Sequence, residues 1–315
     1  MPKVSVIIPT HSRPQLLSRA VESARTAGTN VEIIVVDDAS TGDTAKVCRE
    51  LKGVKHVRLE LNQGVAGARN IGILASSADY IAFLDDDDLR LPGSLDLQVE
   101  ALVNNNSAGF VCGAMLMADQ EGRLTGEALL PNHYGDVFWP LLELDFPVMP
   151  ISVVVRRECF TRVGLFNASL PGIDDWDILV RIAELYPVVV LDKPVSIYRK
   201  PTPFSEQGSS AQAQHLSRAA RHQLSLLCLP RARTARTSRT REVRRRALKR
   251  IADTLLLNAA QAIRDRAYKF ACANSLAALR LHPLRVLRPA GYLKLASMLW
   301  TDRHAKHAPP VRSLS

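Results

Sequence analysis

The sequence predicts an α/β fold with a mostly parallel central sheet, followed by a helical C-terminal segment. Three observations lead to this prediction. Short apolar, β-branched runs alternate with helix-like segments in the N-terminal part of the chain. Acidic residues directly follow two of these runs, and from residue 211 onward Ala, Leu and Arg recur at helical spacing without a strand pattern. We therefore expect an α/β domain over residues 1–204 and a helical extension over residues 205–315.

The first two strand–helix units are expected at residues 4–8 and 13–27, and at residues 31–36 and 43–51. Both strand candidates are continuous apolar runs, which is typical of strands covered on both faces. The second helix follows the polar cluster at residues 40–43, which has the composition of an N-cap. The chain thus begins with a repeated β–α rhythm.

A third strand is expected at residues 57–61, a helix at 67–76, and a fourth strand at 80–84. Strands that alternate with helices imply a parallel sheet with right-handed crossovers. The glycines of the third helix, Gly67 and Gly72, are expected to serve close helix packing. In such sheets the ligand lies beyond the carboxyl ends of the strands.

The later part of the α/β domain has a weaker pattern. Helices are expected at residues 95–102 and 175–185, and strands at 110–117 and 151–155. Loops between about 120 and 150 are expected to choose the acceptor, because binding residues concentrate on loops. Prolines interrupt the helical text after residue 211, and the domain boundary is placed between 200 and 210.

The charge of the chain is divided between its two parts. Residues 1–204 hold 19 Lys and Arg against 26 Asp and Glu, a net charge of −7, whereas residues 205–315 hold 22 against 5, a net charge of +17. The five cysteines are scattered, which indicates a reducing compartment. We find no signal-peptide pattern and no apolar stretch of the roughly 20 residues that span a bilayer. A cytoplasmic protein is expected, either soluble or peripheral at the inner face of the membrane.

Polar groups directly follow three of the predicted strands. These are Pro9 and Thr10, then Asp37 and Asp38, then the run from residue 85 to 88. They should converge on one rim of the sheet. The four adjacent carboxylates offer D-x-D spacing twice, which suits a hard cation such as Mn²⁺ or Mg²⁺, and their mutual repulsion would be relieved by it. A solvated acidic turn or a set of helix caps is the alternative interpretation.

Four blocks of sequence resemble the N-terminal signature of the family 2 glycosyltransferases, which have the GT-A type of fold. The blocks are VSVIIPT, IIVVDDAS, NQGVAGARNIG and YIAFLDDDD, in this order, over roughly the first 95 residues. The resemblance implies metal-dependent, inverting transfer of a sugar from a nucleotide-diphosphate sugar, usually a UDP-sugar, to a hydroxyl group. It also implies a role in the synthesis of cell-surface polysaccharide or lipopolysaccharide.

The resemblance also assigns roles to single residues. A carboxylate accepts from the N–H of a uracil ring, and arginine offers a fork of donors to carbonyl and phosphate groups. The alternative to a role in nucleotide binding is an N-cap for Asp38 and a surface ion pair for Arg69. By resemblance, Pro9 and Thr10 lie at the nucleotide pocket, Asp38 recognises the base, Arg69 contacts the nucleotide, Asp86 reaches the ribose or diphosphate, and Asp87, with Asp85, binds the metal.

A second acidic group, residues 174–177, precedes a helical segment and resembles the family's ED-type motif, with Asp174 in place of the usual Glu. The match implies that Asp175 is the base that takes the proton of the acceptor hydroxyl. Ordinary capping of a helix N-terminus is the alternative. The QxxRW motif of processive synthases is absent, which favours the addition of one sugar to each acceptor. The family's histidine after residue 199 is also absent, which leaves a third metal ligand open.

The segment from residue 231 to 250 is dense in Lys and Arg and contains one acid, Glu242. It could dock on anionic lipid headgroups, bind phosphate backbones, or form a solvated helical face. The lipid surface is favoured over nucleic acid because many acceptors of the family are lipid-linked. A glycan is the other acceptor expected. Residues 251–281 have the pattern of a helical hairpin that covers the catalytic domain or forms a homodimer contact.

Two other classes of protein were weighed against a glycosyltransferase. A nucleotidyltransferase would place a Gly-rich, basic loop after the first strand, whereas residues 10–14 here are Thr-His-Ser-Arg-Pro. A non-catalytic binding protein would act through its basic tail and need not keep the carboxylates. The carboxylates are present, which favours the enzyme.

Overall fold

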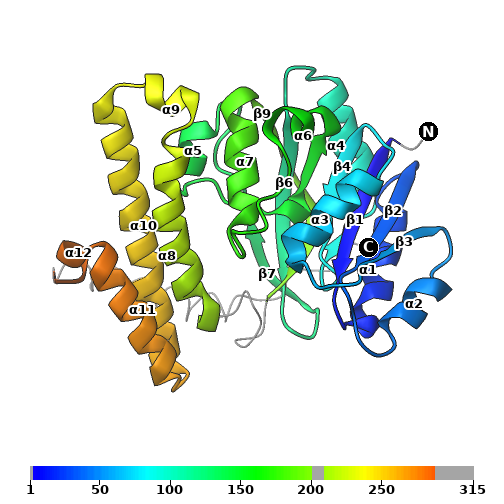
Figure 1. The fold of residues 1–315 in the computed structure, drawn as a ribbon, viewed down its shortest axis with the longest axis horizontal. Coiled ribbons are helices and arrows are strands. Elements are labelled where there is room, and N and C mark those ends of the chain that lie inside the picture. Colours follow the sequence, from blue (N-terminus) through cyan, green and yellow to red (C-terminus); the bar gives the residue numbers. More distant parts are fainter. Residues whose placement is uncertain (1–2, 201–208, 288–315) are drawn as a thin grey trace. The chain divides into compact units, whose positions relative to one another are not determined.

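The computed structural model describes residues 3–200 and 209–287. The chain divides into two compact units (Figure 1). The first consists of Met1–Leu141 with Phe146–Lys200, and the second of Leu142–Asp145 with Pro201–Ser315. In Figure 1 the first unit runs from blue to green, and the helices of the second run from yellow-green to orange.

The first unit is built on one sheet with the strand order β3-β2-β1-β4-β8-β6-β9-β5, and β7 pairs with β6 outside this order. The strands are β1 (Val4–Thr10), β2 (Val31–Asp37), β3 (Val54–Arg58), β4 (Tyr80–Phe83), β5 (Leu89–Arg90), β6 (Phe110–Ala118), β7 (Leu124–Leu129), β8 (Val153–Arg156) and β9 (Val188–Arg199). The helices are α1 (Pro14–Thr26), α2 (Thr44–Glu50), α3 (Gly64–Ala75), α4 (Ser94–Val103), α5 (Phe138–Leu142), the 3₁₀ helix η1 (Pro150–Ser152), α6 (Arg157–Val163) and α7 (Asp174–Leu185).

The predicted α/β class is confirmed, and the sheet is parallel in its first half. Strands β3, β2, β1 and β4 are parallel neighbours, as β–α alternation requires. Beyond β4 the sheet is mixed: β8 runs antiparallel to both β4 and β6, whereas β9 runs parallel to β6. Strands β5, β7 and most of β9 were not expected from the sequence.

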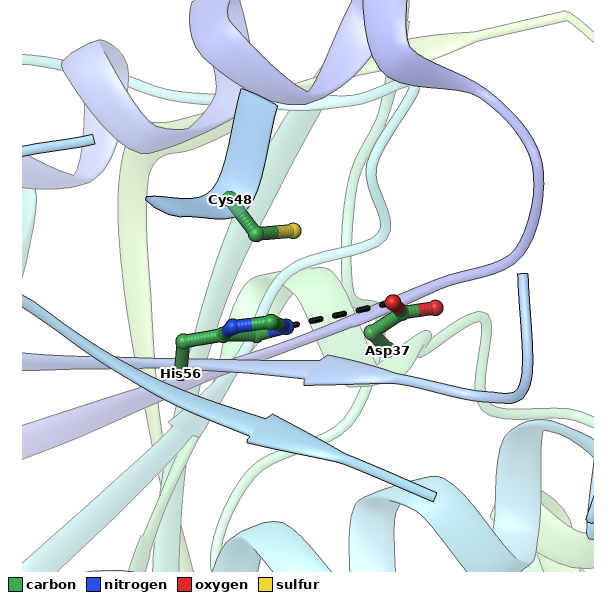
Figure 2. Close-up of side chains that lie close together, drawn as sticks. All are labelled: Asp37, Cys48 and His56. Carbon is green, nitrogen blue, oxygen red and sulfur yellow. Dashed lines mark ion pairs between the residues drawn. The ribbon is translucent and has the colours of Figure 1, made fainter. Parts of the chain in front are cut away.

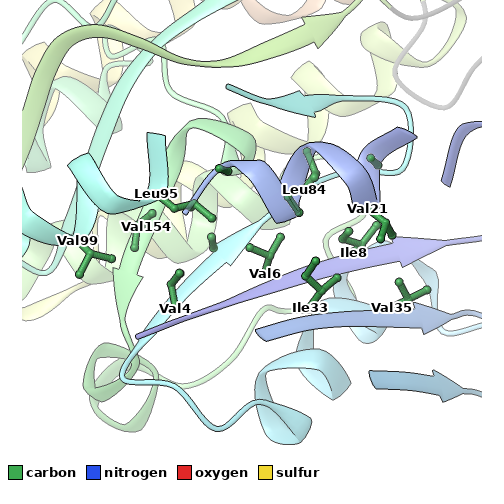
Figure 3. Packing of buried hydrophobic residues seen from close by; sticks show 14 of the residues in the cluster. Val4, Val6, Ile8, Val21, Ile33, Val35, Leu84, Leu95, Val99 and Val154 are labelled. Atoms are coloured by element: carbon green, nitrogen blue, oxygen red, sulfur yellow. The ribbon is translucent and has the colours of Figure 1, made fainter. Parts of the chain in front are cut away.

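Strand β1 lies at the centre of the core because all seven of its residues are buried. One face carries Val4, Val6 and Ile8, which pack with residues of α1, α4 and the neighbouring strands (Figure 3). On the other face, Ile7 meets α3 at Gly72, where an added Cβ would lie 2.2 Å from the Ile7 Cγ2 atom. The glycine therefore allows α3 to approach β1 closely, as the sequence predicted.

The second unit is helical. Its helices are α8 (Ser209–Leu226), α9 (Pro230–Thr234), α10 (Thr237–Arg264), α11 (Tyr268–Leu281) and α12 (Pro283–Leu287). Small and aliphatic side chains of α8, α10 and α11 form its core, among them Ala220, Ile251, Leu255 and Ala278. Among the described residues, no helix has both the length and the apolarity to cross a membrane.

The short segment of residues 142–145 belongs to the helical unit and brings acidic groups to its basic helices. Glu143 is buried, and its carboxylate lies 3.3 Å from Arg246 Nη1 and 3.8 Å from Arg239 Nη2. Asp145 pairs with Arg250. Part of the basic charge on α10 is thus neutralised within the unit itself.

Candidate functional site

The carboxyl ends of β1, β2 and β4 meet at one edge of the sheet. The backbone N–H of Asp38 donates to the carbonyl of Thr10 at 2.9 Å, and that of Leu84 donates to the carbonyl of Ile7 at 3.0 Å. These bonds place Thr10, Asp38 and the acidic turn at residues 85–88 side by side. The rim expected from the strand ends is present.

Asp86 is a buried carboxylate of this rim, with 4% of its surface exposed. The Thr10 hydroxyl donates to its Oδ2 atom at 2.7 Å, and Arg13 Nη1 donates to its Oδ1 atom at 3.2 Å. Burial nevertheless raises the pKa of Asp86 to about 6, because desolvation outweighs these two favourable contacts. Sequence reasoning missed Arg13, although a basic residue three positions after Thr10 is a visible signal.

Asp87 is the most open carboxylate of the turn, with 31% of its side chain exposed. Arg13 Nη1 lies 3.1 Å from its Oδ2 atom, and burial together with Asp85 raises its pKa. The Oδ1 atom of Asp88 accepts from the backbone N–H of Arg199 at 2.7 Å, whereas its Oδ2 atom is buried without a hydrogen-bond partner. Burial and the neighbouring carboxylates raise the pKa of Asp88 strongly.

The buried Arg90 holds the acidic turn from both sides. Its Nη2 atom donates to the carbonyls of Phe83 at 3.2 Å and Val153 at 3.0 Å, and its Nη1 atom donates to Gln98 at 2.8 Å. Because Phe83 precedes the turn and Arg90 follows it, these bonds fix both of its ends. Burial without a counter-charge lowers the pKa of Arg90 to about 9.

Arg69 joins the acidic turn to the second acidic group. It lies on α3, is buried, and donates from Nη2 to Asp85 Oδ1 at 2.8 Å and from Nη1 to Asp174 Oδ2 at 3.3 Å. Its guanidinium carbon also lies 5.6 Å from the ring centre of Phe166. The ion pair considered for Arg69 is therefore buried in the protein, and both of its terminal nitrogens are bonded to carboxylates.

Asp175 lies in the first turn of α7, beside Asp174. Its Oδ1 atom accepts from the backbone N–H of Trp176 at 2.7 Å, and Asp175 also lines an apolar pocket with Phe83 and Phe166. Burial and then the charge of Asp174 raise the pKa of Asp175 to about 6. The indole N–H of Trp176 donates to the carbonyl of Leu141 at 2.8 Å, which anchors that ring.

Asp38 is buried and organises the loop before α3. Its Oδ1 atom accepts from the backbone N–H of Gln63 at 2.7 Å, and His11 Nδ1 lies 2.7 Å from its carbonyl oxygen. The preceding Asp37 binds elsewhere, to Arg58 and to the backbone N–H of Ser40. Pro9, Thr10, Asp38, Arg69, Asp85, Asp86, Asp87 and Asp175 all lie in the first unit.

The carboxylates of the acidic turn have the chemistry that a hard dication needs. Carboxylate oxygens are the preferred ligands of Mn²⁺ and Mg²⁺. The carboxylate oxygens of the half-buried Asp87 and the buried, unpartnered Oδ2 atom of Asp88 are ligands that a cation could satisfy. Burial is the largest cause of the raised pKa values of Asp86, Asp87 and Asp88, and the charges of the neighbouring carboxylates add to it. A cation would offset this negative charge.

The fold is an α/β domain of the nucleotide-diphospho-sugar transferase type. Residues 5–153 match the model of glycosyl transferase family 2, which supports a GT-A glycosyltransferase of this family. This confirms the family that the four sequence blocks indicate.

Relatives with assigned names are also glycosyltransferases. An uncharacterized glycosyltransferase of Rickettsia bellii is 36% identical over 185 residues, which cover 58% of this chain and 26% of the relative. A GalNAc(5)-diNAcBac-PP-undecaprenol beta-1,3-glucosyltransferase of Campylobacter jejuni is 38% identical over 133 residues, which cover 40% of this chain and 42% of that protein. The chain spans between 26% and 62% of the length of four curated relatives that it matches.

Solved structures share the fold. The crystal structure of S. aureus TarS 1-349 in complex with UDP-GlcNAc aligns with a TM-score of 0.55 and 15% identity, over 87% of this chain and 91% of that one. The crystal structure of S. aureus TarS aligns with a TM-score of 0.57 and 17% identity, over 79% of this chain and 43% of that one.

Proposed function

We propose that this protein transfers one sugar from a UDP-sugar to a hydroxyl of a glycan or lipid-linked acceptor, with inversion at the anomeric carbon. One observation carries the proposal: a chain of contacts runs from Asp38 through Thr10 to Asp86, and from Asp85 through Arg69 to Asp174. The donor-side carboxylates and the acidic start of α7 are therefore parts of one connected site.

On the donor side, Asp38 would accept a hydrogen bond from the uracil ring, beside Pro9 and Thr10. Asp86 would reach the ribose or the diphosphate. S. aureus TarS 1-349, whose crystal structure is in complex with the uridine nucleotide sugar UDP-GlcNAc, shares the fold. Arg69 would act on the nucleotide by orienting Asp85 and Asp174, because its terminal nitrogens already bind both carboxylates.

Asp87, assisted by Asp85, would hold Mn²⁺ or Mg²⁺. When bound, the ion would neutralise charge on the leaving diphosphate. The Oδ1 atom of Asp85 already accepts a hydrogen bond from Arg69, whereas the side chain of Asp87 is more exposed than that of Asp85. Asp87 is thus the principal ligand in this proposal.

On the acceptor side, Asp175 would take the proton of the attacking hydroxyl. The acceptor oxygen forms a bond to the anomeric carbon, and the bond from that carbon to the diphosphate oxygen breaks. UDP leaves with the bonding pair, and the proton stays on Asp175 until solvent removes it. Its raised pKa, about 6, supports this role because a stronger base accepts the proton more readily yet is still ionised at pH 7.

The acceptor is proposed to belong to the assembly of cell-surface polysaccharide. The name of the Campylobacter jejuni relative states an undecaprenol-diphosphate-linked substrate, and that protein is 38% identical over 133 residues. A lipid-linked acceptor would bring the enzyme to a membrane surface. The basic helix α10 offers the charge for such contact.

Replacing Asp87 by Ala should reduce transfer about a thousandfold, because a bound cation contributes several kcal/mol of charge stabilisation. Sugar transfer, measured over a Mn²⁺ titration, should lose its dependence on the metal. The fold should persist because the substitution removes one of four repelling carboxylates.

The matched control for this experiment is Asp79→Ala, at the opposite end of β4 and exposed to solvent. It should transfer sugar at the wild-type rate. If Asp87→Ala also retained near-normal, metal-stimulated turnover, the metal assignment would be wrong.

Binding to anionic vesicles should depend on the exposed arginines of the basic segment. Each basic residue near such a surface contributes about 1 kcal/mol, so the triple variant Arg236→Gln, Arg241→Gln and Arg245→Gln should bind roughly a hundredfold more weakly. Co-sedimentation of the full chain with phosphatidylserine vesicles at two salt concentrations measures this. The control changes three exposed cations of the first unit, Lys46, Arg49 and Lys52, to Gln, and equal losses in both variants would refute a specific docking segment.

A further inference from the structure

Three potential metal ligands of different chemistry gather on the outer part of the sheet in the first unit. Asp37 ends β2, His56 lies within β3, and Cys48 lies on α2. One donor atom from each residue lies within 4.8 Å of the others (Figure 2). None of the three is assigned a role in sugar transfer here.

The fold brings these side chains together through strand register and helix packing. Parallel pairing sets Val35 beside His56 and Asp37 beside Arg58, so Asp37 and His56 extend from the same face of neighbouring strands. Helix α2 covers this face and contributes Cys48, which is 2% exposed. In Figure 2 the sulfur atom projects into the space beside the His56 and Asp37 side chains.

An unsatisfied nitrogen atom points to a ligand at this cluster. His56 Nε2 is buried without a hydrogen-bond partner, and its nearest anionic atom, Asp37 Oδ2, lies 3.9 Å away. That distance is too long for a hydrogen bond but is close to the separation of two ligands on one metal ion. A cation between the two residues would satisfy the imidazole.

The donor set selects the kind of cation. Thiolate, imidazole and carboxylate are the ligands that Zn²⁺ binds, whereas Mg²⁺ and Mn²⁺ prefer oxygen. Zinc is tetrahedral, so three protein ligands leave one position for water or a small ligand. The ligand set is therefore different in chemistry from the acidic turn at residues 85–88.

In the structure, the guanidinium of Arg58 supplies the positive charge that a bound cation would bring to Asp37. Its Nη1 atom lies 2.5 Å from Asp37 Oδ2, and its Nη2 atom donates to the carbonyl of Ser40 at 2.8 Å. The Arg58 side chain is 45% exposed, so it can move into solvent when a dication takes its place. The Oδ1 atom of Asp37 accepts from the Ser40 N–H and can keep that bond.

We propose that Asp37, Cys48 and His56 form a zinc site on the outer part of the sheet. Binding forms bonds from the metal to the Cys48 sulfur, the His56 nitrogen and the Asp37 oxygen, and it releases the Cys48 thiol proton to solvent. No group is oxidised or reduced.

The ionisation of the ligands agrees with this site. Burial raises the pKa of the Cys48 thiol to about 11, so the thiol keeps its proton until a metal displaces it. Burial lowers the pKa of His56, which keeps the imidazole neutral and able to coordinate.

Cobalt provides a direct test because Co²⁺ substitutes for Zn²⁺ and reports a thiolate ligand through a near-ultraviolet charge-transfer band. The full-length, reduced protein is titrated with Co²⁺ alone. We expect the band to saturate at one equivalent and to disappear when Zn²⁺ is added. Carboxylates of the acidic turn cannot produce this band, so the test is independent of the proposed function.

Two variants locate the site. Cys48→Ser should abolish the charge-transfer band, and His56→Gln should weaken cobalt binding at least tenfold, whereas Cys228→Ser with Cys272→Ser should leave both unchanged. The paired controls remove the exposed thiols. A band that persists in Cys48→Ser would overturn the proposal. So would the absence of the band in the wild-type protein, and this second outcome does not depend on the stability of any variant.

Discussion

Asp175→Asn should abolish sugar transfer, with a loss of about a thousandfold, because a positioned general base contributes 10²–10⁴-fold. The amide keeps the shape of the side chain but cannot accept the hydroxyl proton. Binding of UDP, measured by thermal shift, should be retained because Asp175 lies on the acceptor side of the proposed site. A transfer rate above a tenth of the wild-type rate would exclude Asp175 as the base.

The pH dependence of the same reaction checks this role. The folded-state pKa of Asp175 is about 6, above its ordinary value, so the carboxylate becomes protonated as the pH falls through 6. The transfer rate should then fall about tenfold per pH unit. Because the ionised form is disfavoured by burial, Asp175→Asn should be at least as stable as the wild type at pH 7. Asp79 is exposed and precedes β4, at the end of that strand opposite to the acidic turn. Asp79→Asn is the matched control and should change neither the pH dependence of transfer nor the stability.

Arg69→Met should lower the free energy of unfolding by about 3–5 kcal/mol, because it leaves two carboxylates without their buried counter-charge. Asp174 has 3% of its side chain exposed and Asp85 has 19%. Transfer should be lost as well, since both acidic groups would shift. Urea unfolding and the transfer assay measure the two effects separately.

A second substitution tests whether the buried charges cause this loss. Adding Asp174→Asn to Arg69→Met should restore part of the stability, because one unpaired charge is removed. The difference in unfolding free energy between Arg69→Met and wild type should also narrow as the pH falls, since burial raises the pKa of Asp174 and protonation neutralises this carboxylate. Additive losses in the double variant would show that packing against Phe166, and not charge, makes Arg69 necessary. The stability of Arg69→Lys should lie between those of the wild type and Arg69→Met, because lysine keeps the charge but lacks the planar fork of arginine.

The rim of the site could be predicted because each of its parts directly follows a strand. Thr10, Asp38 and the turn at residues 85–88 are placed by local sequence and by the rule for parallel sheets. The contacts of Arg69 could not be predicted from the sequence in this way. Its partner Asp174 is 105 residues away, and no periodicity encodes that separation.

Elements with few buried residues were predicted least well. Strand β3 was expected at residues 57–61 but lies at Val54–Arg58, because apolar Leu59 and Leu61 suggested a continuing strand. Leu61 is in fact 77% exposed, and β3 is an edge strand with no fully buried residue. At such an edge the apolar pattern does not fix the ends of the strand.

Long-range pairing explains the missing strands. Strand β9 (Val188–Arg199) is held along its length by β6 and at its end by β5, with register shifts opposite Gly113 and Ala114. Its middle contains Asp192, Lys193 and Pro194, a composition typical of a turn. Tertiary pairing has overridden that local signal.

The placement of residues 142–145 likewise depends on distant partners. Glutamate is usually found on the protein surface. Glu143 is nevertheless only 4% exposed, and its charge is neutralised by Arg239 and Arg246. The acidic and basic members of this group are about a hundred residues apart, so a charge count treats them as unrelated. The net charge of the tail therefore overstates the charge that α10 presents to solvent.

The geometry of the ionic site rests on a contact between uncharged atoms. At Gly72, α3 lies so close to β1 that a single methyl group would overlap the side chain of Ile7. Arg69 is three residues earlier on that helix, so a helix lifted from the sheet would carry the guanidinium away from both of its acids. One hydrogen atom in place of a side chain thus sets the spacing between the donor-side charges and the proposed base.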